Sequence, residues 1–397
     1  MSIAMPPSTV RSRVASIDAL RGLVMILMAL DHTRDFFGAT AVSPTDLTRT
    51  TAALFLTRWI THICAPTFFL LTGTSAYLTL GRRTVPQLSR LLVTRGLWLI
   101  ALELTVARCF GYQFNVDYRL TLLVVLWALG WSMIGLGALV RLPPSAVAAI
   151  GAGMIAFHNL LDPIRPAALG AFAPLWSILH APGVVLSTPA HTVFVAYPLI
   201  PWVGVTAVGF GLGALYAQHG DRRRRILLVV GVTLTTAFLV LRAINVYGDP
   251  VRWSTQPSAV FTTLSFLNAT KYPPSLLFLL MTLGPAALVL RSIDARTPAF
   301  LSPSRVYGKV PLFYFVGHLT LIHLLAVAVC YARYGTAHWM FESPRPDQYP
   351  ITPPPGWGYS LPAVYALWIT VVVLLYPACR WYAAIKAQRG AWWISYF

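Results

Sequence analysis

Four ionisable residues, Asp31, His32, Arg34 and Asp35, follow directly after an uncharged apolar run. In a helix, Asp31 would lie beside Arg34 and Asp35, and His32 would lie beside Asp35. Imidazole titrates near neutral pH, so His32 could act as a general base while Asp35 or Asp31 orients its ring. Arg34 could neutralise Asp31 or bind an anionic substrate group. The alternative is a solvated helix end whose charges have no catalytic role.

The apolar run before these residues is short for a membrane span. His32 lies eleven residues after Arg21, which corresponds to roughly 16 Å of helix against a hydrocarbon core of about 30 Å. One of the two charged ends must therefore lie within the membrane. Ionisable groups there are costly and usually face a protein interior or a watery cavity, which makes the stretch 18–35 a candidate site.

A second candidate base, His62, lies near the start of the next apolar run. The two runs would form antiparallel neighbours, which can bring His62 close to His32. Two histidines at one level of the membrane favour a functional site, whereas a lone buried histidine is more often structural. We therefore predict that His32 and His62, together with Asp31 and Asp35, carry the catalysis.

Basic residues gather at the opposite ends of the apolar runs, namely Arg21, Arg82, Arg83 and Lys309. Guanidinium and ammonium groups at the mouth of a helix bundle could bind the phosphates of a cofactor. Membrane topology alone also places basic residues at such positions, so both explanations stay open for this set.

Candidate contacts to a second substrate lie later in the chain. Lys271, shortly after Asn268, would lie at the outer face, where the topology disfavours a basic residue, so it could bind an anionic group. His318 and His323 are five residues apart, which puts them about 140° apart on a helix. We expect one of them to line a cavity and the other to be packed or hydrogen-bonded. The predicted substrate contacts are Arg34, Asn268, Lys271 and His318.

Two further charges, Glu103 and Arg242, lie within apolar runs. A buried charge in a membrane needs a partner or a cavity. We expect each of these residues to form an ion pair with another helix.

The elements that position these residues are those of a helical membrane protein. Of the 397 residues, 57% are hydrophobic and only 11% are charged, whereas soluble proteins carry about 25% charged residues. The net charge of +18 is explained by basic cytoplasmic loops, and no nucleic-acid motif is present. The four cysteines are scattered without metal-binding spacing, so we expect neither a structural disulfide nor a metal.

Hydropathy predicts an all-α, polytopic transmembrane bundle of about ten spans. Most of the 30 basic residues fall on one side if the N-terminus is cytoplasmic, so both termini are expected in the cytoplasm. The chain then consists of a tail (1–16), a transmembrane domain (17–384) and a second tail (385–397). The predicted spans are 17–37, 58–80, 91–111, 119–140, 145–161, 192–217, 225–247, 272–291, 308–331 and 361–384.

Three long outer loops, at 162–191, 248–271 and 332–360, are rich in proline and aromatic residues. We expect little secondary structure in them. Such loops often form lids or binding surfaces. They could roof a cavity over the bundle, or they could form a rigid outer cap without a binding role.

An ordered set of motifs resembles bacterial members of the heparan-α-glucosaminide N-acetyltransferase catalytic-domain family. The resemblance runs from about residue 13 to the C-terminus. The motifs are Ser-Ile-Asp-Ala-Leu-Arg-Gly (16–22), Asp-His-Thr-Arg-Asp-Phe-Phe (31–37), Ala-Pro-Thr-Phe-Phe-Leu-Leu-Thr-Gly (65–73), Tyr-Pro-Leu-Ile-Pro-Trp-Val-Gly (197–204), Lys-Tyr-Pro-Pro-Ser (271–275), Gly-Lys-Val-Pro-Leu-Phe-Tyr (308–314) and Leu-Tyr-Pro-Ala-Cys-Arg-Trp (375–381).

The resemblance implies transfer of an acetyl group from cytosolic acetyl-CoA to the amine of a terminal glucosamine across a membrane. The first span is also similar to that of membrane acyltransferases that O-acylate sugars, in which an inner Arg and an outer His are the functional pair. Arg21 and His32 match those positions. The family's lysosomal member carries Asn in place of His32 and a catalytic His in the following outer loop, where residues 38–57 contain no His.

We therefore predict an acetyl-CoA-dependent N- or O-acetyltransferase, with acetyl-CoA as donor and an extracytoplasmic glycan or amino sugar as acceptor. The expected location is the bacterial inner membrane, with membrane lipids as partners, a second copy of the chain as a candidate partner, and no nucleic acid. A proton-coupled transporter that uses the buried His, Asp and Glu residues as a relay is the alternative, although no inverted repeat is visible. A membrane scaffold would not need these buried charges.

Overall fold

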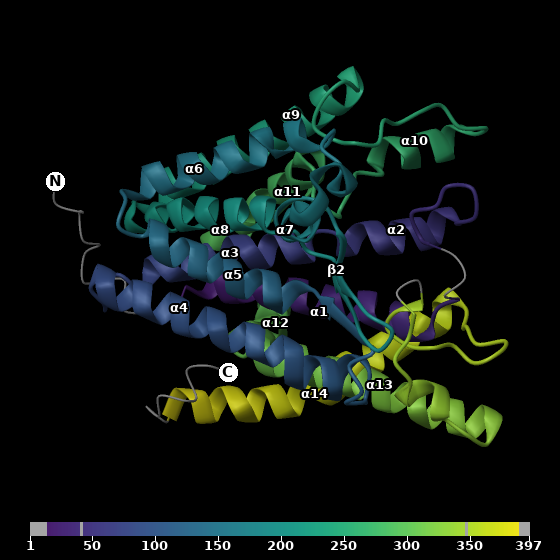
Figure 1. The fold of residues 1–397 in the computed structure, drawn as a ribbon. Coiled ribbons are helices and arrows are strands. Elements are labelled where there is room, and N and C mark those ends of the chain that lie inside the picture. The colour runs from purple at the N-terminus through teal and green to yellow at the C-terminus, as the bar shows by residue number, and fades with distance from the viewer. Residues whose placement is uncertain (1–13, 40–42, 346–347, 389–397) are drawn as a thin grey trace.

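The computed structural model describes residues 14–39, 43–345 and 348–388, and it is a bundle of helices capped at one end by a small sheet (Figure 1). The first residues of α1 and the last of α14 lie at the same end of the bundle, which we call the inner end. Arg11, Arg13 and Arg389, which supported the predicted orientation, lie outside the described residues.

Helices account for most of the described chain. The α-helices are α1 (Ala15–Phe37), α2 (Ala52–Thr61), α3 (Cys64–Leu78), α4 (Val85–Leu102), α5 (Val125–Leu139), α6 (Pro144–Phe157), α7 (Ala173–Leu179), α8 (Leu199–Ala214), α9 (Gly220–Ile244), α10 (Ala259–Leu267), α11 (Leu276–Asp294), α12 (Ser302–Lys309), α13 (Pro311–Tyr334) and α14 (Leu361–Gln388). A π-helix η1 (Glu103–Tyr112) extends α4, and short 3₁₀ turns are η2 (His158–Leu161), η3 (Pro166–Phe172), η4 (Leu215–Ala217), η5 (Ala299–Leu301) and η6 (His338–Phe341).

The predicted all-α membrane fold is confirmed. Among the described residues, seven helical stretches are long and apolar enough to cross a membrane: 52–82, 144–161, 199–217, 220–244, 276–294, 311–334 and 361–388. They correspond to seven of the ten predicted spans. The other three predicted spans are α1, which carries the charged cluster, α4 with η1, and the shorter α5.

Two predicted spans begin as strands. Residues Leu120–Leu123 form β1 and Thr192–Val195 form β3, which pair in parallel, and Gly183–Ser187 form β2 on the other side of β3. The predicted spans 119–140 and 192–217 were therefore too long at their first residues. Short apolar runs do not distinguish a strand from a helix by periodicity. The three outer loops that were expected to have little secondary structure hold η3, α7 and β2 in the first, α10 in the second and η6 in the third.

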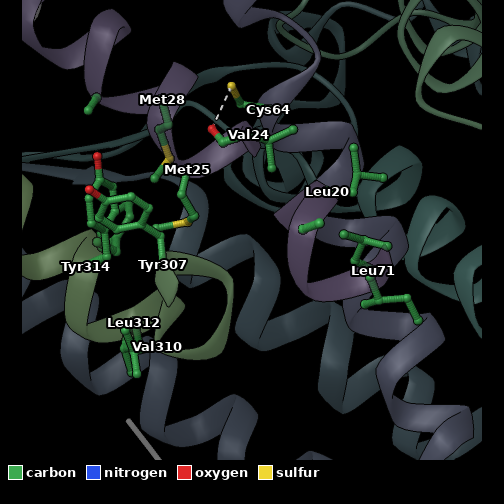
Figure 2. Close-up of a cluster of buried hydrophobic side chains, with 14 of the residues drawn as sticks. Leu20, Val24, Met25, Met28, Cys64, Leu71, Tyr307, Val310, Leu312 and Tyr314 are labelled. Carbon is green, nitrogen blue, oxygen red and sulfur yellow. Dashed lines mark hydrogen bonds between the residues drawn. The ribbon is translucent and has the colours of Figure 1, made fainter. Parts of the chain in front are cut away.

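The first helix is the centre of the fold, because its side chains are buried on most faces. Leu20, Val24 and Met25 are each 1% exposed and lie in one apolar cluster with residues of α3, α12 and α13 (Figure 2). Within a membrane, close van der Waals packing rather than removal from water holds such side chains together. The Cys64 thiol donates a hydrogen bond of 3.3 Å to the Val24 carbonyl, which joins α3 to α1.

Two glycines allow α1 and α12 to touch backbone to backbone. A Cβ atom at Gly22 would lie 1.7 Å from the Ser304 carbonyl oxygen, and one at Gly308 would lie 1.9 Å from the Asp18 carbonyl oxygen. Only a residue without a side chain fits at such a crossing. This contact fixes the inner half of α1, including Arg21, against the segment that carries Lys309.

Candidate active site

Asp31 is the centre of an ion network at the outer end of α1. Its carboxylate accepts from the Arg34 guanidinium at 3.0 Å, from the Thr61 hydroxyl at 3.1 Å, and from Arg58 in a close contact. Asp31 and Arg34 are only 9% and 8% exposed. Arg58 and Thr61 lie in the last turns of α2, so the network ties α2 to α1. The sequence did not single out either residue, although a basic residue at the outer end of a span was a signal.

His32 lies between this network and the rings of His318 on α13 and Tyr112 on η1. Its ring centroid lies 5.3 Å from that of His318 and 5.8 Å from that of Tyr112, and its Nδ1 lies 3.7 Å from an Asp35 carboxylate oxygen. The His32 side chain retains 16% exposure. The imidazole is thus partly accessible and has a carboxylate on one side, which is the arrangement that a general base requires.

His318 has a fixed tautomer. Its Nδ1 donates to the Tyr314 carbonyl at 2.8 Å, which leaves a lone pair on Nε2 in the neutral ring. The Nε2 atom is buried and has no hydrogen-bond partner in the described part of the chain. His323 instead bonds the carbonyls of Gly111 and Met340 through both nitrogens. The two histidines therefore have different neighbours, as the helical spacing predicted, with His318 beside His32 and His323 hydrogen-bonded. Both are fully buried, and neither lines the cavity described below.

His62 lies within electrostatic range of Arg58, Lys271 and Asp31, but among the described residues it makes no ring contact with His32. It follows the last residue of α2, is 2% exposed, and its ring packs 5.2 Å from that of Phe278 on α11. Its Nδ1 has no hydrogen-bond partner among the described residues. The ring contacts of His32 are with His318 and Tyr112, not with His62. The structure therefore brings together His32 and His318 rather than the predicted pair of His32 and His62.

The predicted substrate contacts differ in whether their polar groups already bond to other residues of the protein. Arg34 is sandwiched between Asp31 and Asp35, so neutralisation accounts for its position. The Asn268 amide donates to the Thr45 carbonyl at 3.0 Å. Lys271 lies within electrostatic range of Asp31 and His32 and carries its ammonium 5.2 Å from the Tyr272 ring.

Positive charge dominates the loop beside this site. Burial raises the pKa of the Tyr272 hydroxyl, but Lys271 and Arg58 outweigh this effect and bring the pKa below its ordinary value. Lys271 and Arg58 therefore bring positive charge to the outer end of the bundle beside Tyr272.

A cavity of about 520 Å³ opens beside the inner half of α1. Arg21 lines it and donates to the Asp18 carboxylate at 3.0 Å, the Gly308 carbonyl at 3.0 Å and the Ser75 hydroxyl at 2.8 Å. Arg82 and Lys309 also line the cavity, whereas the exposed Arg83 does not. The cavity has further cationic and aromatic lining residues that the sequence reasoning missed: Arg95, Trp98 and Lys386.

The cavity extends toward the histidines. Met28 lines it and precedes His32 by four residues, so one helical turn of about 6 Å separates them. Phe315 lines it as well, and its ring centroid lies 5.7 Å from that of His318. The inner basic mouth and the outer histidine pair thus lie toward opposite ends of α1, and the lining of the cavity ends about one helical turn before His32.

The expected ion pairs of Glu103 and Arg242 are wrong. Glu103 accepts from the backbone N–H groups of Leu126 at 2.8 Å and Trp127 at 3.3 Å, so it caps the first turn of α5. The positive end of a helix dipole stabilises a carboxylate at this place. Arg242 donates to four backbone carbonyls, those of Val251, Ser265, Phe266 and Asn268. Sequence alone does not reveal such backbone partners.

Comparison with known proteins connects this architecture to one family. A comparison with curated protein sequences gave no significant match. The model of the family described as heparan-alpha-glucosaminide N-acetyltransferase, catalytic, matches residues 13–244, which is more than half of the chain. The matched part includes α1 and the ion network but ends before Lys271 and His318. The chain therefore belongs to the heparan-α-glucosaminide N-acetyltransferase catalytic family.

Proposed function

We propose that the chain transfers an acetyl group from acetyl-CoA, bound at the inner cavity, to an amine or hydroxyl of an amino sugar or glycan at the outer end. The observation that carries this proposal is the cavity beside the inner half of α1, with Arg21 at its basic mouth and Met28, one turn before His32, in its lining. In this proposal a long, thin acyl-pantetheine arm runs from the cavity toward His32. Family membership supports the acetyltransferase class.

Basic side chains around the inner mouth suit the phosphates of the donor. Arg21 is held by three partners, so its guanidinium is oriented before any ligand binds. Arg82 and Lys309 add positive charge from two other elements. Charge-assisted bonds from such groups to phosphate are about twice as strong as neutral ones.

His32 is the proposed base at the acceptor. It would take the proton from the attacking amine or hydroxyl as the new C–N or C–O bond forms and the C–S bond of the thioester breaks. The proton would then pass to the departing CoA thiolate, so that no other reactant is needed. Asp35, 3.7 Å from Nδ1, stabilises the imidazolium formed in between. Holding both substrates in one path makes the reaction effectively intramolecular.

The roles of the remaining predicted residues follow from their contacts. Asp31 positions the outer end of α1 through Arg58 and Thr61, and His318 shares the acceptor side with His32. Lys271 is the proposed contact to a polar or anionic acceptor group. His62, packed against Phe278, would influence the site through the α2–α3 junction. The bacterial inner membrane remains the proposed location.

The test measures acetyl-CoA binding by purified protein in detergent, with desulfo- or dephospho-CoA as competitor probes. We expect saturable binding that raises the melting temperature and that weakens when the CoA 3′-phosphate is absent. Solute uptake driven by a proton gradient, with no thermal shift by acetyl-CoA, would instead support a transporter and contradict the proposal.

A further inference from the structure

A second group of chemically competent side chains lies away from the candidate active site, at the outer end of the bundle. His158 begins η2, Asp162 follows η2, and His180 caps the end of α7. One ligand atom from each residue lies within 4.8 Å of the others. None of the three residues lines the inner cavity.

The two histidines are buried, and most of their ring nitrogens lack a hydrogen-bond partner among the described residues. Each is 2% exposed. Neither ring nitrogen of His158 makes a hydrogen bond of ordinary geometry within the described residues, although the Pro274 carbonyl faces the ring, and Nδ1 of His180 has no partner there either. A buried polar atom without a partner costs about 1–3 kcal/mol. A ligand that accepts one lone pair from each imidazole would satisfy one nitrogen of each ring and leave the other His158 nitrogen to the Pro274 carbonyl.

The existing contacts already approach the spacing of a metal site. The distance from His180 Nε2 to an Asp162 carboxylate oxygen is 3.1 Å. Two ligands of a tetrahedral Zn²⁺ ion, each about 2.0–2.1 Å from the metal, are separated by roughly 3.3 Å. The other Asp162 oxygen accepts from the Asn159 amide at 2.8 Å, which fixes the carboxylate as an outer-shell partner does in metal sites.

We propose that His158, Asp162 and His180 bind a divalent transition-metal ion, for which Zn²⁺ is the best match. Two imidazoles and one carboxylate form a ligand set typical of Zn²⁺, with a water molecule completing the tetrahedron. An ion pair of His180 with Asp162 alone would leave His158 unexplained.

A bound ion at this site would link the outer loop to the helix bundle. The three ligands join the end of α6 to the end of α7 and so close the segment 163–179. The Asn159 side-chain oxygen also accepts from the Leu276 N–H at 2.8 Å, at the first residue of α11. The proposed metal site therefore lies beside the segment Lys271–Ser275. Its role is structural, and it does not depend on which group the protein transfers.

Metal content tests this proposal directly. The full chain is purified with a streptavidin-type tag, because a polyhistidine tag would bind metal, and is then dialysed against a chelator and reloaded with Zn²⁺ or Co²⁺. We expect one equivalent of Zn²⁺ per chain and a tetrahedral Co²⁺ absorption spectrum. His158→Asn and His180→Asn should lose the bound metal. Asn159→Ala should bind it about 10–100-fold more weakly.

The matched control is His338→Asn, which alters an exposed histidine that also faces a carboxylate, that of Glu342 at 3.8 Å. It should retain one equivalent of metal. Zn²⁺ should raise the melting temperature of the wild type and of His338→Asn, but not that of His180→Asn. If the wild type binds no Zn²⁺ and melts at the same temperature with chelator as with Zn²⁺, the proposal is wrong. This wild-type comparison decides the matter even where a ligand variant fails to fold.

Discussion

The two ends of α1 carry charges of the same kinds but use them differently. At the inner end, Asp18 and Arg21 border a cavity of about 520 Å³. At the outer end, Asp31 is buried in contact with both Arg34 and Arg58. Both ends thus hold an ion pair, since Arg21 also contacts Asp18 at 3.0 Å, but only the inner pair borders a cavity. This difference supports the proposal that the inner end receives a ligand and that the outer end holds a reactive side chain in place.

Replacing the proposed base should have the largest effect. His32→Ala is expected to lower acetyl transfer by about 10²–10⁴-fold, because general-base catalysis contributes that much. Acetyl-CoA binding should stay unchanged, since His32 lies beyond the cavity. The measurement is the rate of acetyl transfer beside a binding isotherm. If His62→Ala abolishes transfer while His32→Ala leaves it intact, His32 is not the general base and the proposal is wrong on this point.

Breaking the outer ion network should mainly reduce stability. Asp31→Asn leaves the buried Arg58 without its carboxylate and leaves Arg34 with Asp35 alone, and breaking other buried pairs costs about 3–5 kcal/mol. Denaturant titration in detergent micelles measures the loss. The control is Asp46→Asn, in a loop where the carboxylate accepts from the Thr48 backbone and hydroxyl among the described residues, with an expected change within about 0.5 kcal/mol. Equal effects of the two variants would show that the network contributes nothing.

A side chain at the backbone crossing should disturb the inner end. Gly22→Ala places a Cβ 1.7 Å from the Ser304 carbonyl oxygen, so α1 and α12 must separate. Overpacking costs about 1–3 kcal/mol, and donor binding should weaken as the cavity wall moves. Gly153→Ala is the matched control, because a Cβ there meets nothing within 4 Å. It should be neutral or stabilise by up to about 1 kcal/mol. A fully stable Gly22→Ala variant would refute the close contact.

The smallest effect is expected from single basic residues at the cavity mouth. Arg82→Ala should weaken acetyl-CoA binding by about tenfold, the value of one charge-assisted hydrogen bond. Arg83→Ala, one residue along, should change binding by less than about twofold, because Arg83 does not line the cavity. Isothermal titration of both variants makes the comparison. Equal losses would mean that general positive charge, not the cavity lining, attracts the donor.

The sequence predicted those features that depend on local spacing. The membrane fold, the charged ends of α1 and the difference between His318 and His323 follow from hydropathy and helical periodicity. The contact of Asp31 with Arg58 does not, because it depends on the length of the loop between α1 and α2 and on how α2 is rotated. The approach of His318 to His32 depends likewise on the packing of helices far apart in the chain.

The backbone partners of buried charges and the grouping of the proposed metal ligands were the least predictable features. Glu103 and Arg242 are satisfied by backbone N–H and carbonyl groups, which every residue carries and no motif marks. His158 and His180 are separated by a loop whose path only the fold determines, so their spacing resembles no metal motif. The strands β1 and β3 were mistaken for the first turns of helices because short apolar runs suit both structures.

Acetyl transfer from a donor on one side of a membrane to an acceptor on the other side tests the central claim most directly. The protein is reconstituted into vesicles, with labelled acetyl-CoA on the side of the inner end and glucosamine trapped on the other, and the orientation is fixed by protease access to a terminal tag. The account predicts labelled N-acetylglucosamine in the lumen of wild-type vesicles and none with His32→Ala. Transfer only when donor and acceptor share one side would contradict a path along α1.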